Sequence, residues 1–473
     1  MSQSIAADPD RLLPADPGTR KIARSLFGLV ERLPILSPHG HVDPRMLLED
    51  TPFPDPATLL VTPDHYVTRL IHAGGVGLDR LRMGPNPTAE PRVAWQEFCK
   101  AWPAFDGTAS GYWIRQEFEH VFRLDLSGLD RDPSAAAADA LYDALSARLA
   151  EPEFRPRRLF TDFNIEVLAT TDDPLDDLAA HAALAADADF TGRVLPTFRP
   201  DAYIKFGHAE FPDNVERLIA AAGDGQAGFP GYLRALANRR QYFIGHGAVS
   251  ADHGTRAPLT LRLDGADAQD LFDKGRRGEA TAAEADIFEA HMTYQMARMS
   301  AEDGLVMTIH PGVARNHHRP TFEAYGPDTG HDIPFAVDYT NGLRPLLEDF
   351  GSAPGFHLIP FTIDETAFSR EIAPLAGFYP SVFIGAPWWF LDAPDAMLRF
   401  RSAVTETAGF SRSSGFIDDT RAFCSIPARH DTSRRIEASF LARLVAERRV
   451  SEERAAAIIV DVVDAAPRRA FKL

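Results

Sequence analysis

Cysteine and basic residues are scarce in this 473-residue chain, and its apolar runs are short. The two cysteines, Cys99 and Cys424, cannot form a disulfide framework in a chain of this length, and neither lies in a CxxC pair. No run of about 18 uncharged apolar residues is present, so no membrane span is predicted. Residues 1–20 are acidic and lack the apolar segment of a signal peptide. We therefore expect a cytoplasmic protein with no membrane partner.

Basic residues are fewer than acidic residues. The sequence has 49 Lys and Arg against 67 Asp and Glu, a formal net charge of −18. A protein that binds duplex nucleic acid needs a basic face to displace phosphate counterions, and the two basic runs, 155–158 and 468–472, are short. The sequence therefore excludes a nucleic-acid partner. A hydrophobic content of 45% and a charged content of 25% are ordinary for a globular protein with a large core.

Short apolar runs alternate with helical stretches along the chain, a pattern typical of βα units around a parallel sheet. The segments predicted as strands are Pro34–Ser37, Val167–Thr171, Arg193–Phe198, Gln241–Gly245, Leu305–Ile309, His357–Phe361, Ser381–Gly385 and Gly415–Ile417. Eight strands are the number found in a closed (β/α)8 barrel. The sequence thus predicts an α/β fold, a (β/α)8 TIM barrel.

The predicted first and second strands are separated by far more residues than an ordinary crossover needs, and this stretch has helical patterning. We therefore expect an inserted helical subdomain. The expected organisation is an N-terminal helical segment (1–33), the first strand and start of the barrel (34–84), the helical insertion (85–160), the remainder of the barrel (161–432) and a C-terminal helical segment (433–473).

Metal-ligating side chains follow the first and last predicted strands. His39 and His41 are two positions apart on an extended segment, so both imidazoles point to one side, and Gly40 lets the backbone approach closely. Asp419 follows the last strand, which is the neighbour of the first in a closed barrel. These three residues could bind zinc or another divalent ion. The alternative is that Asp418 or Asp419 caps the following helix.

Arginines follow three other predicted strands. Arg199, Arg315 and Arg421 lie after the third, fifth and eighth strands, where the active sites of such barrels are found. The guanidinium group binds carboxylates and phosphates well. Singly each arginine is more often a surface ion-pair partner, but their shared location favours a site for a small anion.

Several further side chains at this end of the barrel are candidates for proton transfer or substrate contact. His65 and Tyr66 can relay protons, although a helix-packing pair is the alternative. Trp388 and Trp389 could form an aromatic wall for a sugar ring or a plug that closes the barrel. Other polar groups at strand ends are His310, Asp252 with His253, and His246, while His317 and His318 are expected to face substrate or solvent.

Taken in order, these strand-end segments resemble the uronate isomerase (glucuronate isomerase) family of the amidohydrolase superfamily. The resemblance runs from about Pro34 to Ile436 and rests on 39–41, 64–66, 112–113, 170–174, 198–201, 252–253, 310–316, 388–390, 419–421, 429–430 and 434–436. It implies a barrel of the metal-dependent hydrolase type.

The resemblance implies a reversible aldose–ketose isomerisation of hexuronates, D-glucuronate to D-fructuronate and D-galacturonate to D-tagaturonate. It places a divalent metal, expected to be zinc, on His39, His41 and Asp419. The reaction moves a proton between C2 and C1 through an enediol, for which His65, Tyr66 or Asp419 could serve. The residues expected around the hexuronate are Arg199, His310, Arg315, Asn316, Trp388, Trp389 and Arg421.

The chain departs from the family pattern in three places. Gly40 stands where the family usually has cysteine, and residues 315–318 read Arg-Asn-His-His instead of Arg-Asn-Asn-Asn. The segment 362–365 lacks the usual asparagine. The loop after the fifth strand borders the expected substrate, so these departures leave open a related sugar acid as the substrate.

Two other functions remain open from the sequence. A metal-dependent hydrolase of the same superfamily would use the same ligands on an amide, ester or lactone, but the predicted fourth strand has no lysine for a carbamylated bridge. An inactive barrel that only binds sugar acids is the second alternative. The sequence also leaves open whether the chain forms a homo-oligomer.

Overall fold

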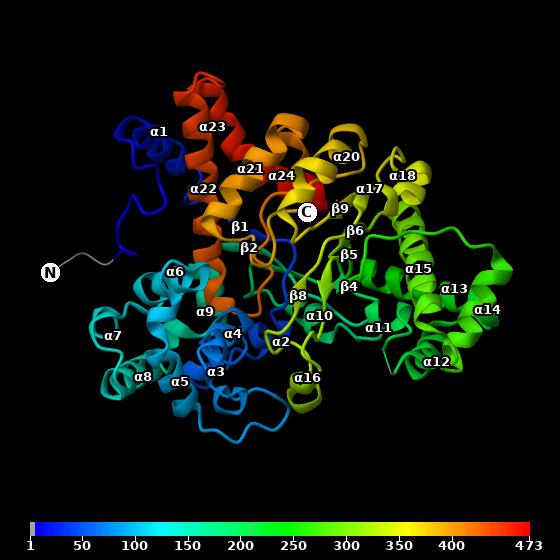
Figure 1. Ribbon diagram of the computed structural model, residues 1–473, viewed down its shortest axis with the longest axis horizontal. Coiled ribbons are helices and arrows are strands. Elements are labelled where there is room, and N and C mark those ends of the chain that lie inside the picture. The colour runs from blue at the N-terminus through cyan, green and yellow to red at the C-terminus, as the bar shows by residue number, and fades with distance from the viewer. Residues whose placement is uncertain (1–4, 209) are drawn as a thin grey trace.

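Parallel strands form the centre of the molecule and helices surround them in the computed structural model, which describes residues 5–208 and 210–473 (Figure 1). One sheet has the order β1-β2-β3 and a second the order β4-β5-β6-β9, and all of these pairs are parallel. The strands are β1 (Ile35–Ser37), β2 (Ile165–Ala169), β3 (Arg193–Leu195), β4 (Thr197–Phe198), β5 (Ser250–His253), β6 (Val306–Ile309) and β9 (Leu358–Pro360). The fold is therefore the predicted α/β TIM barrel.

The two sheets belong to one ring of strands, and isolated hydrogen bonds and bridges connect them where regular strand pairing is missing. Backbone N–H groups of Thr170 and Asp172 donate to carbonyls of the third strand region, at 2.9 and 3.0 Å. After β9, parallel bridges join Leu358 to Val382 and Ile384 to Ser413. The ring closes where the His41 N–H donates to the Thr420 carbonyl at 3.1 Å. The two ends of the barrel sequence therefore meet.

The prediction of the fourth strand is wrong. Residues 241–245 form the last turns of helix α13 (Gly228–Gly245), and the strand is β5 at Ser250–His253. The apolar run that suggested a strand includes Phe243, which is buried in the core against Phe198. Gly247 has φ +91°, which lets the chain reverse after the helix. A short apolar run at a helix end and a buried strand look alike in sequence.

The seventh and eighth predicted strands are replaced by isolated parallel bridges in the structure. In segment 381–385 only Val382 and Ile384 form bridges. Segment 415–417 contains no strand residues, and the bridge to Ile384 is formed by Ser413 instead. A short antiparallel pair, β7 (Val313–Ala314) and β8 (Ile333–Pro334), lies outside the ring. The expected positions of the remaining five strands overlap β1, β2, β3 with β4, β6 and β9.

The connection between β1 and β2 is helical, as expected. Its helices are α2 (Pro44–Glu49), α3 (Pro56–Leu60), α4 (His65–Ala73), α5 (Pro91–Lys100), α6 (Ala109–Gln116), α7 (Ser127–Arg131), α8 (Ala135–Leu149) and α9 (Pro156–Asp162). Aspartates start three of them: the carboxylates of Asp43, Asp55 and Asp64 accept backbone N–H groups of the first turn. Apolar residues of this whole connection share one core with Ile35 and Ile165.

Helices after β2 cover the outside of the barrel (Figure 1). They are α10 (Ala179–Ala186), α11 (Asp201–Ile204), α12 (Phe211–Ala222), α13, α14 (Gly265–Arg276), α15 (Ala282–Asp303), α16 (Arg319–Tyr325), α17 (Tyr339–Gly342), α18 (Arg344–Phe350), α19 (Glu365–Ala367), α20 (Ala373–Phe378) and α21 (Pro394–Ala408). The C-terminal helices are α22 (Ile426–Ala446), α23 (Glu452–Val460) and α24 (Ala466–Phe471). The N-terminal helix α1 (Pro17–Gly28) shares a core with α22 and α23.

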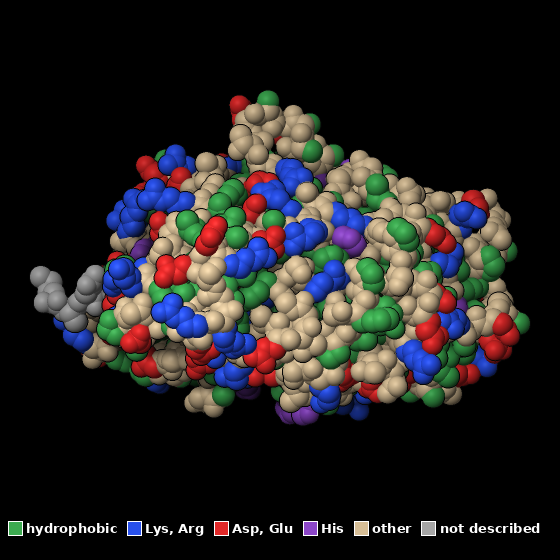
Figure 2. All heavy atoms as spheres, turned by 90° about the horizontal axis from the view of Figure 1, so that it is seen from above, with side chains coloured by type: hydrophobic (Ala, Val, Ile, Leu, Met, Phe, Trp, Pro, Cys, Tyr) green, Lys and Arg blue, Asp and Glu red, His purple; other side chains and the backbone are tan. Residues whose placement is uncertain are grey.

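The surface carries both signs of charge. Lys and Arg side chains are interspersed with Asp and Glu over the face shown in Figure 2, without a large patch of one sign. Within the described part of the chain, no helix is long and apolar enough to cross a membrane.

The ion pair between Arg240 and Asp303 ties the end of α13 to the end of α15. The Arg240 side chain is 0% exposed, and it donates to both carboxylate oxygens of Asp303, at 2.6 and 3.0 Å. We predict that Asp303→Ala lowers the free energy of unfolding by about 3–5 kcal/mol, because it leaves a buried guanidinium unpaired. Chemical denaturation would measure this. The control Glu302→Ala removes an exposed pair with Arg298 and should change stability by no more than about 0.5 kcal/mol.

Candidate active site

Two histidines and an aspartate converge where the barrel closes. The Asp419 Oδ1 atom lies 2.9 Å from His41 Nε2 and 3.3 Å from His39 Nε2. One potential ligand atom from each residue lies within 4.8 Å of those of the other two. The structure thus brings together the three residues that the sequence predicted as metal ligands.

Backbone conformation directs the two neighbouring aspartates to different sides. Asp419 has φ +42°, in the left-handed region that aspartate tolerates better than most residues, and its carboxylate faces the histidines. The Asp418 carboxylate instead contacts His430 Nε2 at 3.1 Å. The caps of the helices that follow are Ala422 and Ser425, so the alternative, in which one of these aspartates caps a helix, does not apply.

The space around position 40 does not require a glycine. A Cβ atom at this position would meet the Ala169 carbonyl and Asp418 Oδ1 at 3.5 Å, which is ordinary van der Waals contact. A close backbone approach at this position therefore does not depend on glycine, and the extended backbone itself aligns the two imidazoles.

Burial and charge set the protonation of the cluster. Burial lowers the pKa of His41 to about 4. Burial also acts on His39, but the carboxylates of Asp252 and Asp419 outweigh it and raise the pKa of His39. Burial opposes ionisation of Asp419, yet His39 beside it holds the pKa of Asp419 well below its usual value. An ionised carboxylate and a neutral His41 are the forms that coordinate metals.

The donor set fits a divalent cation. Asp419 Oδ1 is buried and accepts no hydrogen bond from any residue that the structure describes, although two imidazole nitrogens face it. A buried carboxylate oxygen without a hydrogen bond needs another partner. Two imidazole nitrogens and one carboxylate oxygen leave room for exogenous ligands on a metal, as in catalytic zinc sites.

Asp252 links the cluster to Arg199 and His310. Its Oδ1 atom lies 2.7 Å from His310 Nδ1, and its Oδ2 atom lies 3.2 Å from Arg199 Nη1. The His310 ring stacks on His39, with the ring centroids 4.7 Å apart. His39, Asp252 and His310 also satisfy the distance condition for a second ligand group. The structure therefore places Arg199 and His310 beside the predicted metal ligands.

Asp252 is the central residue of the site that was named from the sequence as a strand-end polar group but given no role. It lies on β5, a strand that the sequence pattern predicts at 241–245. The available signal was the Asp252-His253 pair, which is part of the family resemblance and follows an apolar residue at 251. With the strand at its true position, Asp252 is a strand-end polar residue like the others.

His65 and Tyr66 begin helix α4. The Tyr66 hydroxyl donates to Asp392 Oδ1 at 3.0 Å and accepts from the Phe390 N–H at 2.9 Å. Burial and the Asp392 carboxylate raise the pKa of Tyr66 well above its ordinary value. Among residues 5–208 and 210–473, the buried His65 Nε2 has no hydrogen-bond partner, and burial lowers the pKa of His65. The two side chains therefore differ in availability for proton transfer.

The tandem tryptophans line the site from the segment after residue 385. Trp388 meets the His310 ring edge-on with centroids 4.6 Å apart, and Trp389 meets His65 in the same way at 5.4 Å. Both are buried. These contacts are compatible with both roles that the sequence leaves open for the two tryptophans, an aromatic wall for a sugar ring and a plug that closes the barrel.

The other two arginines pair with carboxylates of the loop at 326–332. Arg421 Nη2 lies 3.3 Å from Asp328, and Arg315 Nη1 lies 2.8 Å from Asp332. The Asn316 backbone N–H also donates to Asp332, at 2.6 Å. His317 and His318, directly before α16, are exposed. Arg199 thus contacts the buried cluster, while Arg315, Asn316 and Arg421 lie at its rim.

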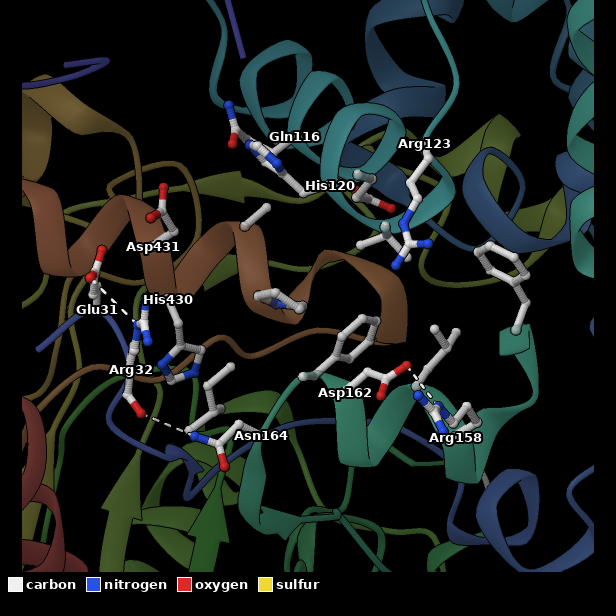
Figure 3. A pocket seen from close by; sticks show the side chains of 18 of the residues that line it. Glu31, Arg32, Gln116, His120, Arg123, Arg158, Asp162, Asn164, His430 and Asp431 are labelled. Atoms are coloured by element: carbon white, nitrogen blue, oxygen red, sulfur yellow. Dashed lines mark hydrogen bonds and ion pairs between the residues drawn. The ribbon is translucent and has the colours of Figure 1, made fainter. Parts of the chain in front are cut away.

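A separate cavity of about 890 Å³ lies between α6, α9 and the first turns of α22 (Figure 3). Its lining includes Glu117 and His430 but none of the three predicted metal ligands. Charged side chains around it pair with one another, as Arg158 does with Asp162 at 2.9 Å. This cavity is therefore distinct from the cluster at the barrel closure.

The Glu117 carboxyl group makes stability depend on pH. Burial raises the pKa of Glu117 from 4.5 to about 8. The folded protein then keeps a proton that the unfolded chain releases, so stability falls as pH rises from 4.5 to about 8. We predict that Glu117→Gln raises the Tm by several degrees at pH 8 and leaves it unchanged below pH 4.5. Glu153→Gln, on the exposed wall of the cavity, is the control, and an equal effect at all pH values would contradict the assignment.

The cluster at the barrel closure predicts a loss of metal on substitution. His41→Ala and Asp419→Asn each remove one of three ligands, and the purified variants should retain less than about a tenth of the metal that the parent chain binds. Elemental analysis after dialysis would measure the bound metal. His318→Ala, an exposed histidine outside the cluster, should keep the parent stoichiometry. Equal metal content in all four proteins would exclude this site.

Comparison with known proteins agrees with the fold. A model of the glucuronate isomerase family matches residues 18–471. The uronate isomerase of Corynebacterium efficiens is 60% identical over 473 residues, which is 100% of each chain. The glucuronate isomerase structure from Caulobacter crescentus has a TM-score of 0.95 and 44% identity, over 99% of this chain and 98% of that one. The uronate isomerase structure from Thermotoga maritima has a TM-score of 0.90 and 26% identity, over 98% and 99%. The chain therefore belongs to the glucuronate isomerase family.

Proposed function

We propose that this protein catalyses the reversible aldose–ketose isomerisation of hexuronates, D-glucuronate to D-fructuronate and D-galacturonate to D-tagaturonate. The observation that carries the proposal is that the His39, His41 and Asp419 cluster adjoins Arg199 at the ends of the barrel strands of a glucuronate isomerase family member. A cation site beside a guanidinium suits a hydroxylated sugar that carries a carboxylate.

A divalent metal, which we propose to be zinc, would be held by His39 Nε2, His41 Nε2 and Asp419 Oδ1. When bound, it would supply Lewis-acid polarisation of the oxygens at C1 and C2 of the sugar. The surrounding side chains would then orient the hexuronate and carry the proton between these two carbons.

Among the proton carriers, the contacts favour His65. A base must present an unprotonated atom to the substrate. The Tyr66 hydroxyl is held by Asp392 and Phe390, and its pKa is raised. His65 is neutral near pH 7 because burial lowers its pKa, and its Nε2 has no partner in the described chain. We therefore propose His65 as the proton acceptor, with ionised Asp419 as the other candidate.

His310 would bind a substrate hydroxyl. Its Nδ1 faces Asp252 at 2.7 Å, which makes Nδ1 the protonated nitrogen of the neutral ring. Burial lowers the pKa of His310, and Nε2 is buried with no hydrogen-bond partner in residues 5–208 and 210–473. An unsatisfied buried acceptor beside His39 is a natural site for a sugar hydroxyl.

The fourth strand in its true position also disfavours a hydrolase. The true strand, β5, reads Ser-Ala-Asp-His and also lacks the lysine that a carbamylated bridge requires. No contact in the described site favours an amide, ester or lactone over a sugar acid.

The deciding experiment is an NMR assay of the purified protein with D-glucuronate and with D-galacturonate, with and without a chelator. We expect exchange of the C2 proton with solvent and formation of the ketose, both lost on chelation and restored by zinc. If neither sugar turns over while a lactone or amide library is cleaved, the hydrolase alternative is correct.

Arg421 provides a test of where the carboxylate binds. We predict that Arg421→Ala raises the KM for D-glucuronate about 10–100-fold, because a hydrogen bond to a charged group contributes about 1.5–3 kcal/mol. Steady-state kinetics would measure this. Arg319→Ala, which removes an exposed pair with Glu323, is the matched control and should leave the KM unchanged. Full activity of the Arg421 variant would remove this residue from the site.

A further inference from the structure

We propose that Asp201, Lys205 and Gly254 are positioning residues, which hold the Arg199 guanidinium in the orientation that receives the anionic sugar. The inference rests on the proposed function for its substrate, but its geometry is independent of that function. None of these three residues lies in the cluster at the barrel closure, and none is a predicted site residue.

Asp201 is the anchor of this arrangement. It begins the short helix α11, immediately after the loop that carries Arg199. Its carboxylate accepts the Gly254 N–H at 3.1 and 3.2 Å and contacts Arg199 Nε at 3.2 Å. Lys205 Nζ lies 3.2 Å from the same carboxylate. Because the backbone directly after β5 and two cations hold it, Asp201 is a fixed acceptor for Arg199.

Two carboxylates fix the plane of the Arg199 guanidinium. Asp201 contacts Nε, and Asp252 contacts Nη1 at 3.2 Å. Asp252 is 0% exposed and also faces His310, which stacks on His39. Contacts on two different nitrogens remove rotation about the last side-chain bond. The two contacts therefore restrain the orientation of the Arg199 guanidinium.

Lys205 balances the net negative charge of Arg199, Asp201 and Asp252. Arg199 carries one positive charge and contacts two carboxylates, so the three residues together would carry 1 − 2 = −1. Lys205 adds one positive charge and also donates to the Gly254 carbonyl at 2.5 Å. The Lys205 and Asp201 side chains are each 16% exposed, so solvent screens their charges weakly. With Lys205 the formal charges of Arg199, Lys205, Asp201 and Asp252 cancel.

Gly254 makes the close approach possible. A Cβ atom at this position would lie 2.7 Å from Arg199 Nη2 and 2.7 Å from Asp201 Oδ2. Gly254 is not among the glycines with positive φ, so the backbone accepts alanine. Gly254→Ala would therefore displace the two side-chain ends without removing a charge and without straining the main chain.

The test compares variants of these residues with matched controls. Gly254→Ala, Asp201→Asn and Lys205→Met should each raise the KM for D-glucuronate at least tenfold, with a smaller change in kcat. Gly265→Ala, where a Cβ meets nothing within 4 Å, controls for the glycine. Asp270→Asn and Lys274→Met remove an ion pair of the same i,i+4 spacing on α14 and control for the charges. The Tm of every variant would be measured as a check of folding.

A second readout does not require turnover. The Arg199 Nε–H resonance, assigned by its loss in Arg199→Lys, should shift in Gly254→Ala and Asp201→Asn and stay in place in the three controls. If the parent isomerises D-glucuronate and the variants match their controls in KM and in this resonance, the positioning role is refuted. If the parent does not isomerise hexuronates but the resonance shifts as expected, the proposed function fails and the positioning of Arg199 stands.

Discussion

The meeting of the first and last strand regions is the constraint on which the site depends. The hydrogen bond from the His41 N–H to the Thr420 carbonyl places a segment from residue 41 beside one from residue 420. Only this closure brings Asp419 to within 3.3 Å of both imidazoles. The helical connection after β1 shares a core with the first strands, so its packing supports the same closure. The cluster of His39, His41 and Asp419 is therefore a product of barrel topology.

Asp252 has a comparable organising role beside the cluster of His39, His41 and Asp419. It faces His310 with one oxygen and Arg199 with the other, so a single buried carboxylate orients a histidine and an arginine from different strands. A buried carboxylate is costly unless it is paired on both oxygens. The pairing that stabilises Asp252 is thus the same pairing that organises the site.

The three expected arginines divide into two environments. Arg199 is held by buried carboxylates, whereas Arg421 and Arg315 are each 45% exposed and contact the loop that carries Asp328 and Asp332. Exposed pairs contribute little to stability and exchange partners readily. The inner arginine therefore suits a fixed contact with the sugar, and the outer arginines suit a carboxylate that enters and leaves.

The sequence by itself determined the barrel class and most strand positions, because short apolar runs between helical stretches are a local pattern. It also predicted that His39, His41 and Asp419 lie close together, since HxH spacing and strand-end location follow from chain geometry. Only the tertiary structure decided that β5 lies at 250–253, because a buried helix end and a buried strand have the same short apolar run. Only it identified the partners of Arg199, Arg421 and Tyr66, because ion pairs and hydrogen bonds between distant residues depend on how the whole chain packs.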